Sequence, residues 1–196
     1  MLREEILAAA DALLIETASE EAVSIRAIGD RVGVSAPSIY RHFTDKDDLM
    51  FAVCERTFGR LDEAMEKAAI EFDDPYDALL ARGRTYVEFG LEHPEHYRVM
   101  LMDTVKDSKS IEFDGHHLSG EVVQGSQAFN HLVEAARGIL GRRRTPDPVT
   151  LAFEIWAFIH GVTSLRITFP TMPWPPLEQQ LANYNDALRA RFTTKR

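Results

Sequence analysis

The sequence predicts an all-α protein, with an N-terminal domain of three helices followed by a bundle of about six. Apolar residues recur at three- and four-residue spacing along nearly the whole chain of 196 residues, as they do on one face of a helix. No stretch alternates between apolar and polar residues over six positions, so we expect no sheet. The length allows one ample domain, or a small domain joined to a larger one.

Three short helices are expected first. The first ends near Ala18, and its apolar face is formed by Ile6, Ala10, Leu13, Leu14 and Thr17. Ser24 stands at the N-cap position of the second helix, and Gly33 ends that helix. Ser35 caps the third helix, which tolerates Pro37 in its first turn.

Longer helices are expected after residue 45. Asp45 and Asp48 resemble an acidic capping arrangement at the start of a long helix over 46–72. Proline and glycine then divide the chain into a helix from Pro75, a short helix around 97–102, a polar loop at 103–120, helices over 121–140 and 148–169, and a final helix.

The charge is unevenly distributed. The chain carries a formal net charge of -9, which opposes wholesale neutralisation of nucleic-acid phosphates. Residues 24–46, however, contain four basic and two acidic side chains, so this segment carries +2 and the remaining chain carries -11. The sequence therefore predicts one local basic face on an acidic molecule.

Composition also limits the compartment and the chemistry. Cys54 is the single cysteine, so neither an intrachain disulfide nor a cysteine-rich zinc module can form. Uncharged runs such as 155–165 are shorter than the ~18 residues that span a bilayer. Glu4 and Glu5 disfavour a signal peptide. We expect a cytoplasmic protein without membrane insertion.

The two short helices within 24–43 have the spacing of a helix-turn-helix, in which the second helix lies in the DNA major groove. Small side chains at the start of that helix allow close approach to base edges: Ser35, Ala36, Pro37 and Ser38. Tyr40, Arg41 and His42 can donate to phosphates, and the fork of Arg26 suits guanine. Ile39 and Phe43 lie four residues apart and are expected to form the buried side of the second helix. The alternative is an ordinary pair of short amphipathic helices with a glycine between them.

On these residues the sequence resembles the TetR family of bacterial regulators. The match comprises the run 24–35 and the pattern Tyr40-x-His42-Phe43-x-x-Lys46-x-x-Leu49, within about the first 50 residues. The total length and the helical remainder are also similar to the family. Farther along, Trp156-x-x-x-His160-Gly161-x-x-x-Leu165 resembles a subgroup with a Trp, His, Gly motif.

The resemblance implies a DNA-binding domain over 1–46 and an effector-binding and dimerisation domain over 47–196. It implies base contacts from Arg26, Ala36, Pro37 and Ser38, and phosphate contacts from Ser24, Tyr40, Arg41, His42 and Lys46. A structural role for His42, as a cap or in packing, stays open. Family members often carry a basic arm before the first helix. Here that helix begins almost at Met1, so minor-groove contact by an arm is not expected.

Two helical stripes predict a homodimer seam. One stripe on the helix 148–169 consists of Ala157, Gly161, Ser164 and Thr168, and one on the last helix consists of Leu177, Leu181, Tyr184 and Leu188. Two such helices from each subunit would form an isologous four-helix interface. The alternative is that both stripes belong to the core of one chain.

The second domain holds the candidates for ligand binding. A pocket between helices is expected from Phe89, Met100, Met102, Phe129, Phe153, Trp156 and His160, although a core position is the more ordinary role for any one of them. Metal ligands could come from His93 and His96, beside Glu92 and Glu95, and from His116 and His117 after Asp114. Pro94 divides the first pair and favours a helix-cap role, so we expect neither a metal nor another cofactor.

The predicted function is a ligand-responsive transcriptional repressor that a small molecule releases from a pseudo-palindromic double-stranded DNA operator. One alternative is a TetR-like DNA-binding protein with no effector and a structural or protein-interaction role. Another is a metal-dependent hydrolase that uses the second-domain histidines. No nucleophile, base and orienting residue stand at a meaningful spacing, so we expect no enzyme.

Overall fold

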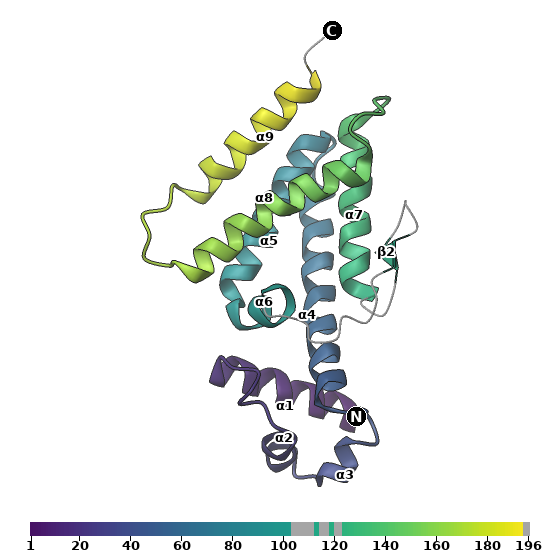
Figure 1. Ribbon diagram of the computed structural model, residues 1–196, viewed down its shortest axis with the longest axis vertical. Helices are drawn as coiled ribbons and strands as arrows, with labels where there is room; N and C mark the ends of the chain where they lie inside the picture. Colours follow the sequence, from purple (N-terminus) through teal and green to yellow (C-terminus); the bar gives the residue numbers. More distant parts are fainter. Residues whose placement is uncertain (103–111, 114–117, 120–122, 194–196) are drawn as a thin grey trace. The chain divides into compact units, whose positions relative to one another are not determined.

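The computed structural model describes residues 1–102, 112–113, 118–119 and 123–193 (Figure 1). Its helices are α1 (Leu2–Thr17), α2 (Ile25–Val32), α3 (Ala36–Ile39), α4 (Lys46–Ala69), α5 (Pro75–Glu92), α6 (Pro94–Leu101), α7 (Val123–Leu140), α8 (Pro148–Thr168) and α9 (Leu177–Thr193). The all-α class and the order of the helices are confirmed.

The expectation of no sheet is wrong at one place. Two strands of two residues each, β1 (Glu112–Phe113) and β2 (Leu118–Ser119), pair in antiparallel register within the segment predicted as a loop. Strands this short are below the length at which alternation between apolar and polar residues can be recognised. All the other residues of the segment 103–120 lie outside the described part of the chain.

The chain packs as two compact units. The first comprises 1–57 and 93–105, and the second comprises 58–92 and 106–196. The boundary falls inside α4, whereas the sequence placed it after residue 46 and assigned everything beyond it to the second domain. The difference arises because α6 packs on α1, and because α4 contributes Leu49, Met50 and Val53 to the core of the first unit.

The core of the first unit is formed by α1, α2, α3 and the start of α4. Its fully or nearly fully buried members include Ile6, Ala10, Leu14, Val23, Ile28, Ile39, Phe43 and Leu49. Val99 of α6 packs against this cluster. The buried role predicted for Ile39 and Phe43 is thus confirmed, and their burial orients the short α3.

Local signals at the helix ends act largely as predicted. Ser24 Oγ accepts the backbone N–H of Ala27 at 3.1 Å, and Gly33 ends α2 with φ +77°. Asp45 Oδ1 accepts the N–H of Asp48 at 2.8 Å, which caps α4. Ser35 stands at the N-cap position of α3, but its hydroxyl pairs with that of Ser38 at 3.1 Å instead of capping the backbone.

The core of the second unit lies among α5, α7, α8 and α9. It includes Tyr76, Leu79, Val133, Ala136, Leu140, Leu151, Ala152, Ile155, Leu188 and Phe192. Asp147 caps α8 by accepting the N–H groups of Val149 and Thr150 at 3.1 and 3.0 Å. By length and composition α8 is apolar enough to cross a membrane, a property that core helices share, and several of its side chains belong to this core.

Candidate nucleic-acid interface

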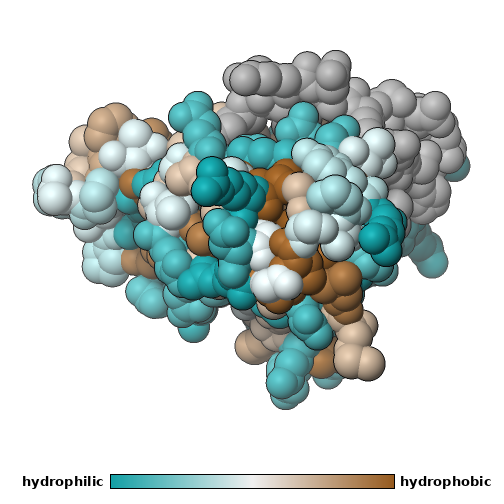
Figure 2. Space-filling model, turned by 90° about the horizontal axis from the view of Figure 1, so that it is seen from below, coloured by the Kyte–Doolittle hydropathy of each residue, from teal (hydrophilic) through white to brown (hydrophobic). Residues whose placement is uncertain are grey.

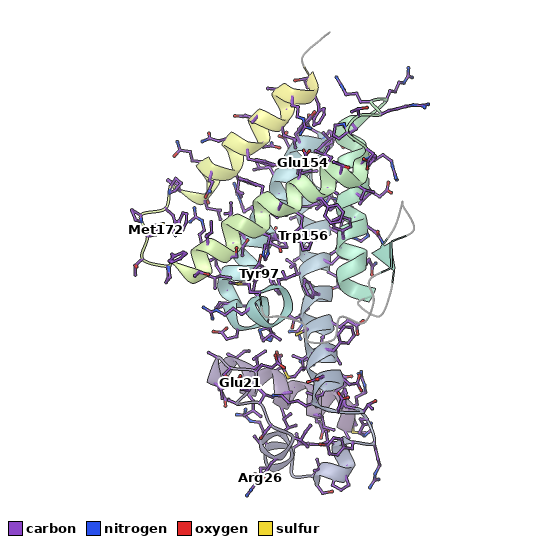
Figure 3. The ribbon with its side chains drawn as sticks, in the orientation of Figure 1. Glu21, Arg26, Tyr97, Glu154, Trp156 and Met172 are labelled. Atoms are coloured by element: carbon purple, nitrogen blue, oxygen red, sulfur yellow. The ribbon has the colours of Figure 1, made fainter. Side chains whose placement is uncertain are left out.

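The polar side of α2 and α3 carries most of the predicted DNA contacts. The side chain of Arg26 is 92% exposed and points away from the body of the first unit (Figure 3). Five more predicted residues are exposed, namely Ser35, Pro37, Tyr40, Arg41 and His42, while Ala36 and Ser38 are half-buried. Figure 2 shows this side from below, mostly in teal and pale colours with smaller brown patches.

Packing holds this surface in place. Ile39 is fully buried and Phe43 is 2% exposed, so one side of α3 is anchored in the core while Pro37, Tyr40 and Arg41 face outward. The turn between the two helices is tight, because a Cβ added at Gly29 would lie 2.7 Å from the carbonyl oxygen of Val34. The arrangement is that of a helix-turn-helix, with a short second helix presented to solvent.

Lys46 has an intrachain partner. Its Nζ donates to the backbone carbonyl of Glu20 at 2.6 Å, and this bond joins the segment before α2 to the start of α4. The half-buried side chain therefore has a structural role that the sequence did not predict. Contact with a phosphate through its remaining N–H donors stays a prediction.

The basic face is partly neutralised by carboxylates. Arg31 donates to Glu16 of α1 at 2.5 Å, and this hydrogen bond lowers the pKa of the Glu16 carboxyl. Arg26 lies 3.9 Å from Asp30 on the same helix. The pairing of Arg31 with Glu16 was not predictable, because the two residues are on different helices. The charge available to DNA is therefore smaller than the formal +2.

A buried polar cluster braces the first unit. His96 of α6 is 2% exposed, and its Nε2 lies 2.6 Å from Asp11 Oδ1 of α1. The other oxygen of Asp11 accepts from Arg56 of α4 at 3.0 Å. His96, considered above as a metal ligand, thus hydrogen-bonds a carboxylate. His93 stands at the N-cap position of α6, while His116 and His117 lie outside the described residues.

Four of the predicted pocket residues come together in the second unit. The rings of Phe129 and Phe153 lie 4.6 Å apart, those of Phe129 and Trp156 6.0 Å, and those of Trp156 and His160 6.2 Å. Trp156 Nε1 donates to the hydroxyl of Tyr86 at 3.4 Å. Burial lowers the pKa of His160, which favours the neutral imidazole. Phe153 remains 45% exposed, so the cluster reaches the surface.

The other three predicted pocket residues are Phe89, Met100 and Met102. Phe89 is half-buried on α5, and the side chain of Met100 lies outside the described part. Met102 belongs to the first compact unit and is 37% exposed, and its role in a pocket stays a prediction. A hollow that the sequence did not predict is lined by Glu66, Lys67, Ala69, Ile70, Phe72, Ala78 and Arg82.

The two predicted dimer stripes differ in exposure. On α8, Ala157 and Thr168 are exposed, Gly161 and Ser164 are half-buried, and a Cβ added at Gly161 would meet nothing within 4 Å. On α9, Leu181 and Leu188 are buried in the chain's own core, and Tyr184 stacks on Phe158 at 3.8 Å. Leu177 is half-buried. Leu181 and Leu188 are therefore core residues, because the apolar stripe of α9 packs within its own chain.

Similarity to known proteins agrees with this architecture. Residues 6–53 match the family described as bacterial regulatory proteins, tetR family, and residues 79–184 match the family described as tetracyclin repressor-like, C-terminal domain. The second match covers more than half of the chain and includes Trp156, His160 and Gly161. The chain therefore belongs to the TetR family, and it is a helix-turn-helix transcriptional regulator. Its assignment to a subgroup by the Trp, His, Gly motif stays a prediction.

Two curated relatives illustrate the similarity. The transcriptional repressor KstR of Mycolicibacterium smegmatis is 36% identical over 59 residues, which are 30% of this chain and only 29% of KstR. The nucleoid occlusion factor SlmA of Escherichia coli is 27% identical over 195 aligned residues, covering 91% of this chain and 94% of SlmA. The match to KstR thus spans less than a third of that protein.

Solved structures share the fold. A Rhodococcus protein of unknown function superimposes with a TM-score of 0.77 at 24% identity, covering 99% of this chain and 96% of that chain. The regulator FadR of Bacillus subtilis, solved in complex with stearoyl-CoA, gives a TM-score of 0.67 at 16% identity, covering 98% and 99%. At these identities the likeness shows the fold alone.

Proposed function

We propose that this regulator is a repressor that binds a pseudo-palindromic operator as a homodimer. The observation that carries the proposal is the exposed polar side of α2 and α3, fixed by the burial of Ile39 and Phe43. Arg26, Ala36, Pro37 and Ser38 contact bases, while Ser24, Tyr40, Arg41, His42 and Lys46 contact phosphates. The similarity of the N-terminal part to a named repressor supports this role.

The effector is a small apolar or amphipathic molecule bound in the second unit. The aromatic cluster of Phe129, Phe153, Trp156 and His160 supports this assignment, because it joins apolar walls to one polar nitrogen and reaches the surface. A structural neighbour carries a fatty acyl thioester ligand. Release from DNA requires the effector to bind the DNA-incompetent state more tightly, and the coupling is reciprocal.

The homodimer forms through the exposed side of α8, at Ala157, Gly161, Ser164 and Thr168. These small side chains allow a partner helix to approach closely. On α9 only Leu177 and Tyr184 of the predicted stripe are left to contribute. The proposed role places the protein in the cytoplasm with its operator, and it needs no catalysis.

Footprinting on the DNA upstream of the protein's own gene tests this proposal. We expect protection of two half-sites about 34–36 Å apart along the duplex, the spacing of one helical turn. Arg26→Ala is expected to lose the footprint, and Arg84→Ala, which removes an exposed arginine of the second unit, is expected to keep it. Protection of a single half-site, or an unaltered footprint with Arg26→Ala, would contradict the proposal.

A second candidate is a DNA-binding protein of this family that has no effector and has a structural or protein-interaction role at the nucleoid. The similarity to a nucleoid occlusion factor over nearly the full length of both chains favours it. Genome-wide immunoprecipitation separates the two functions. A repressor is expected at a few promoters, whereas a protein with a role at the nucleoid is expected at many sites unrelated to promoters.

A further inference from the structure

Three metal-ligating side chains meet in the second unit. Asp62 and Glu66 stand four residues apart on α4, so both carboxylates are on the same helical face. His131 of α7 faces them, with its Nδ1 3.0 Å from Asp62 Oδ1 and 4.0 Å from Glu66 Oε1. The ligand atoms of all three lie within 4.8 Å of one another. The sequence did not predict this cluster, because Asp62 and His131 are separated by 69 residues in the sequence.

The burial of the cluster is unusual for a carboxylate pair. Asp62 is only 5% exposed, although ionised carboxylates are rarely buried without a counter-charge. Glu66 and His131 are about one-third exposed, so the site is half open to solvent. A divalent cation bound at this cluster would place a positive charge next to the buried Asp62 carboxylate.

We propose that Asp62, Glu66 and His131 bind a divalent transition-metal ion. Imidazole nitrogen and carboxylate oxygen together suit zinc, nickel, cobalt or manganese. Donors about 2.0–2.2 Å from such an ion lie roughly 3–4 Å from one another, close to the separations found here. Metal binding would replace the contact between His131 Nδ1 and Asp62 Oδ1, because the Nδ1 lone pair must face the metal while Nε2 carries the ring proton. Three protein ligands leave a position for water or an exogenous ligand.

Arg82 of α5 moderates this site. Its Nε and Nη2 donate to the two oxygens of Glu66 at 2.8 and 3.0 Å. The fork fixes the carboxylate, and each oxygen keeps a second lone pair for a metal. Its positive charge opposes a cation, so we expect binding of moderate affinity. Glu66 and Arg82 also line the surface hollow described above.

Metal titration of the full chain without DNA tests the inference independently of the proposed function. Calorimetric titration with zinc or cobalt is expected to show one metal ion bound per chain. The visible absorption of bound cobalt is expected to saturate at the same ratio. His131→Gln and Glu66→Gln are expected to weaken binding by about tenfold or more. His93→Gln, a matched change in the first unit, is expected to bind as the wild type does.

One further variant keeps the inference testable if the buried Asp62→Asn variant fails to fold. Arg82→Gln is expected to strengthen metal binding. A dissociation constant weaker than about 1 mM for zinc, cobalt, nickel and manganese alike would overturn the inference. Equal affinity in His131→Gln, Glu66→Gln and the wild type would overturn it as well.

Discussion

At the scale of single residues, Ser24 has two tasks that can be separated. Its hydroxyl caps α2 by accepting the N–H of Ala27 at 3.1 Å, and it is also proposed to contact a phosphate. The first task was predictable, because serine before a helical run is a strong N-cap signal. Other contacts, such as the hydrogen bond from Arg31 to Glu16, join residues that only folding brings together. No local sequence pattern predicts such contacts.

Replacement of Ser24 by alanine is expected to lower the free energy of unfolding by about 1 kcal/mol, because the Ala27 N–H loses its acceptor. Ser24→Asp is expected to keep the stability, since aspartate also caps a helix, but to weaken DNA binding because its charge repels a phosphate. Urea unfolding and a DNA titration check both expectations. Equal DNA affinity for Ser24→Ala and Ser24→Asp would contradict the proposed contact between Ser24 and a phosphate.

At the scale of elements, the turn between α2 and α3 depends on close backbone contact. A Cβ at Gly29 would stand 2.7 Å from the carbonyl oxygen of Val34, whereas one at Gly138 in α7 would stand 3.8 Å from Pro75 Cβ, an ordinary contact. The two helical glycines therefore respond differently to the same substitution.

Gly29→Ala is expected to destabilise the protein by roughly 1–3 kcal/mol, because the turn must shift to relieve the clash. Gly138→Ala is expected to stabilise it by roughly 0.5–1 kcal/mol, since alanine favours the helix. Thermal unfolding measures both changes. Gly29→Ala is also expected to reduce DNA binding. Equal melting temperatures for the two variants would contradict this account of the turn.

The contact between α5 and α9 depends on Asp74. Its oxygens accept from Arg189 of α9 at 3.0 and 2.8 Å, and Oδ1 also accepts the N–H groups of Tyr76 and Asp77. The hydrogen bonds from Arg189 hold the pKa of Asp74 below its ordinary value of 3.8. A carboxyl whose pKa is lower in the folded chain than in the unfolded chain stabilises the folded chain at pH values above its unfolded pKa. This stabilisation is lost as pH falls below the unfolded pKa toward the folded pKa.

Arg189→Gln is accordingly expected to lower the melting temperature at neutral pH, because α9 loses its link to the start of α5. The difference from the wild type is expected to shrink as pH falls below 3.8 and Asp74 becomes protonated. Melting curves recorded from neutral to acid pH check this expectation. A difference that stays constant with pH would show that Arg189 acts through packing on Tyr76 instead.

At the scale of the whole molecule, the sequence predicted the class and most helix ends, because caps and breakers are local. It could not tell which side of a helical stripe meets solvent, and so it assigned Leu181 and Leu188 to a dimer seam although they pack in the core. It missed the cluster of Asp62, Glu66 and His131 because it joins two helices distant in sequence. The β1–β2 pair was too short to recognise.

Charge also acts at this scale. A net charge of -9, with basic side chains near α2 and α3 partly paired, limits phosphate attraction to a few contacts per subunit. We expect the logarithm of DNA affinity to fall with the logarithm of salt concentration with a slope well short of about -10. Binding measured over a series of salt concentrations gives this slope, and a slope of that size or steeper would contradict the charge account.

The most direct test of the account is a fluorescence titration of promoter DNA with the wild type, Arg26→Ala, Tyr40→Ala and the control Arg84→Ala. We predict that Arg26→Ala costs roughly 1–3 kcal/mol of binding free energy and relaxes sequence preference. Tyr40→Ala is expected to weaken binding to all sequences alike, and the control is expected to leave binding unchanged. Unaltered sequence-specific binding in both Arg26→Ala and Tyr40→Ala would show that α2 and α3 are not the DNA-reading face.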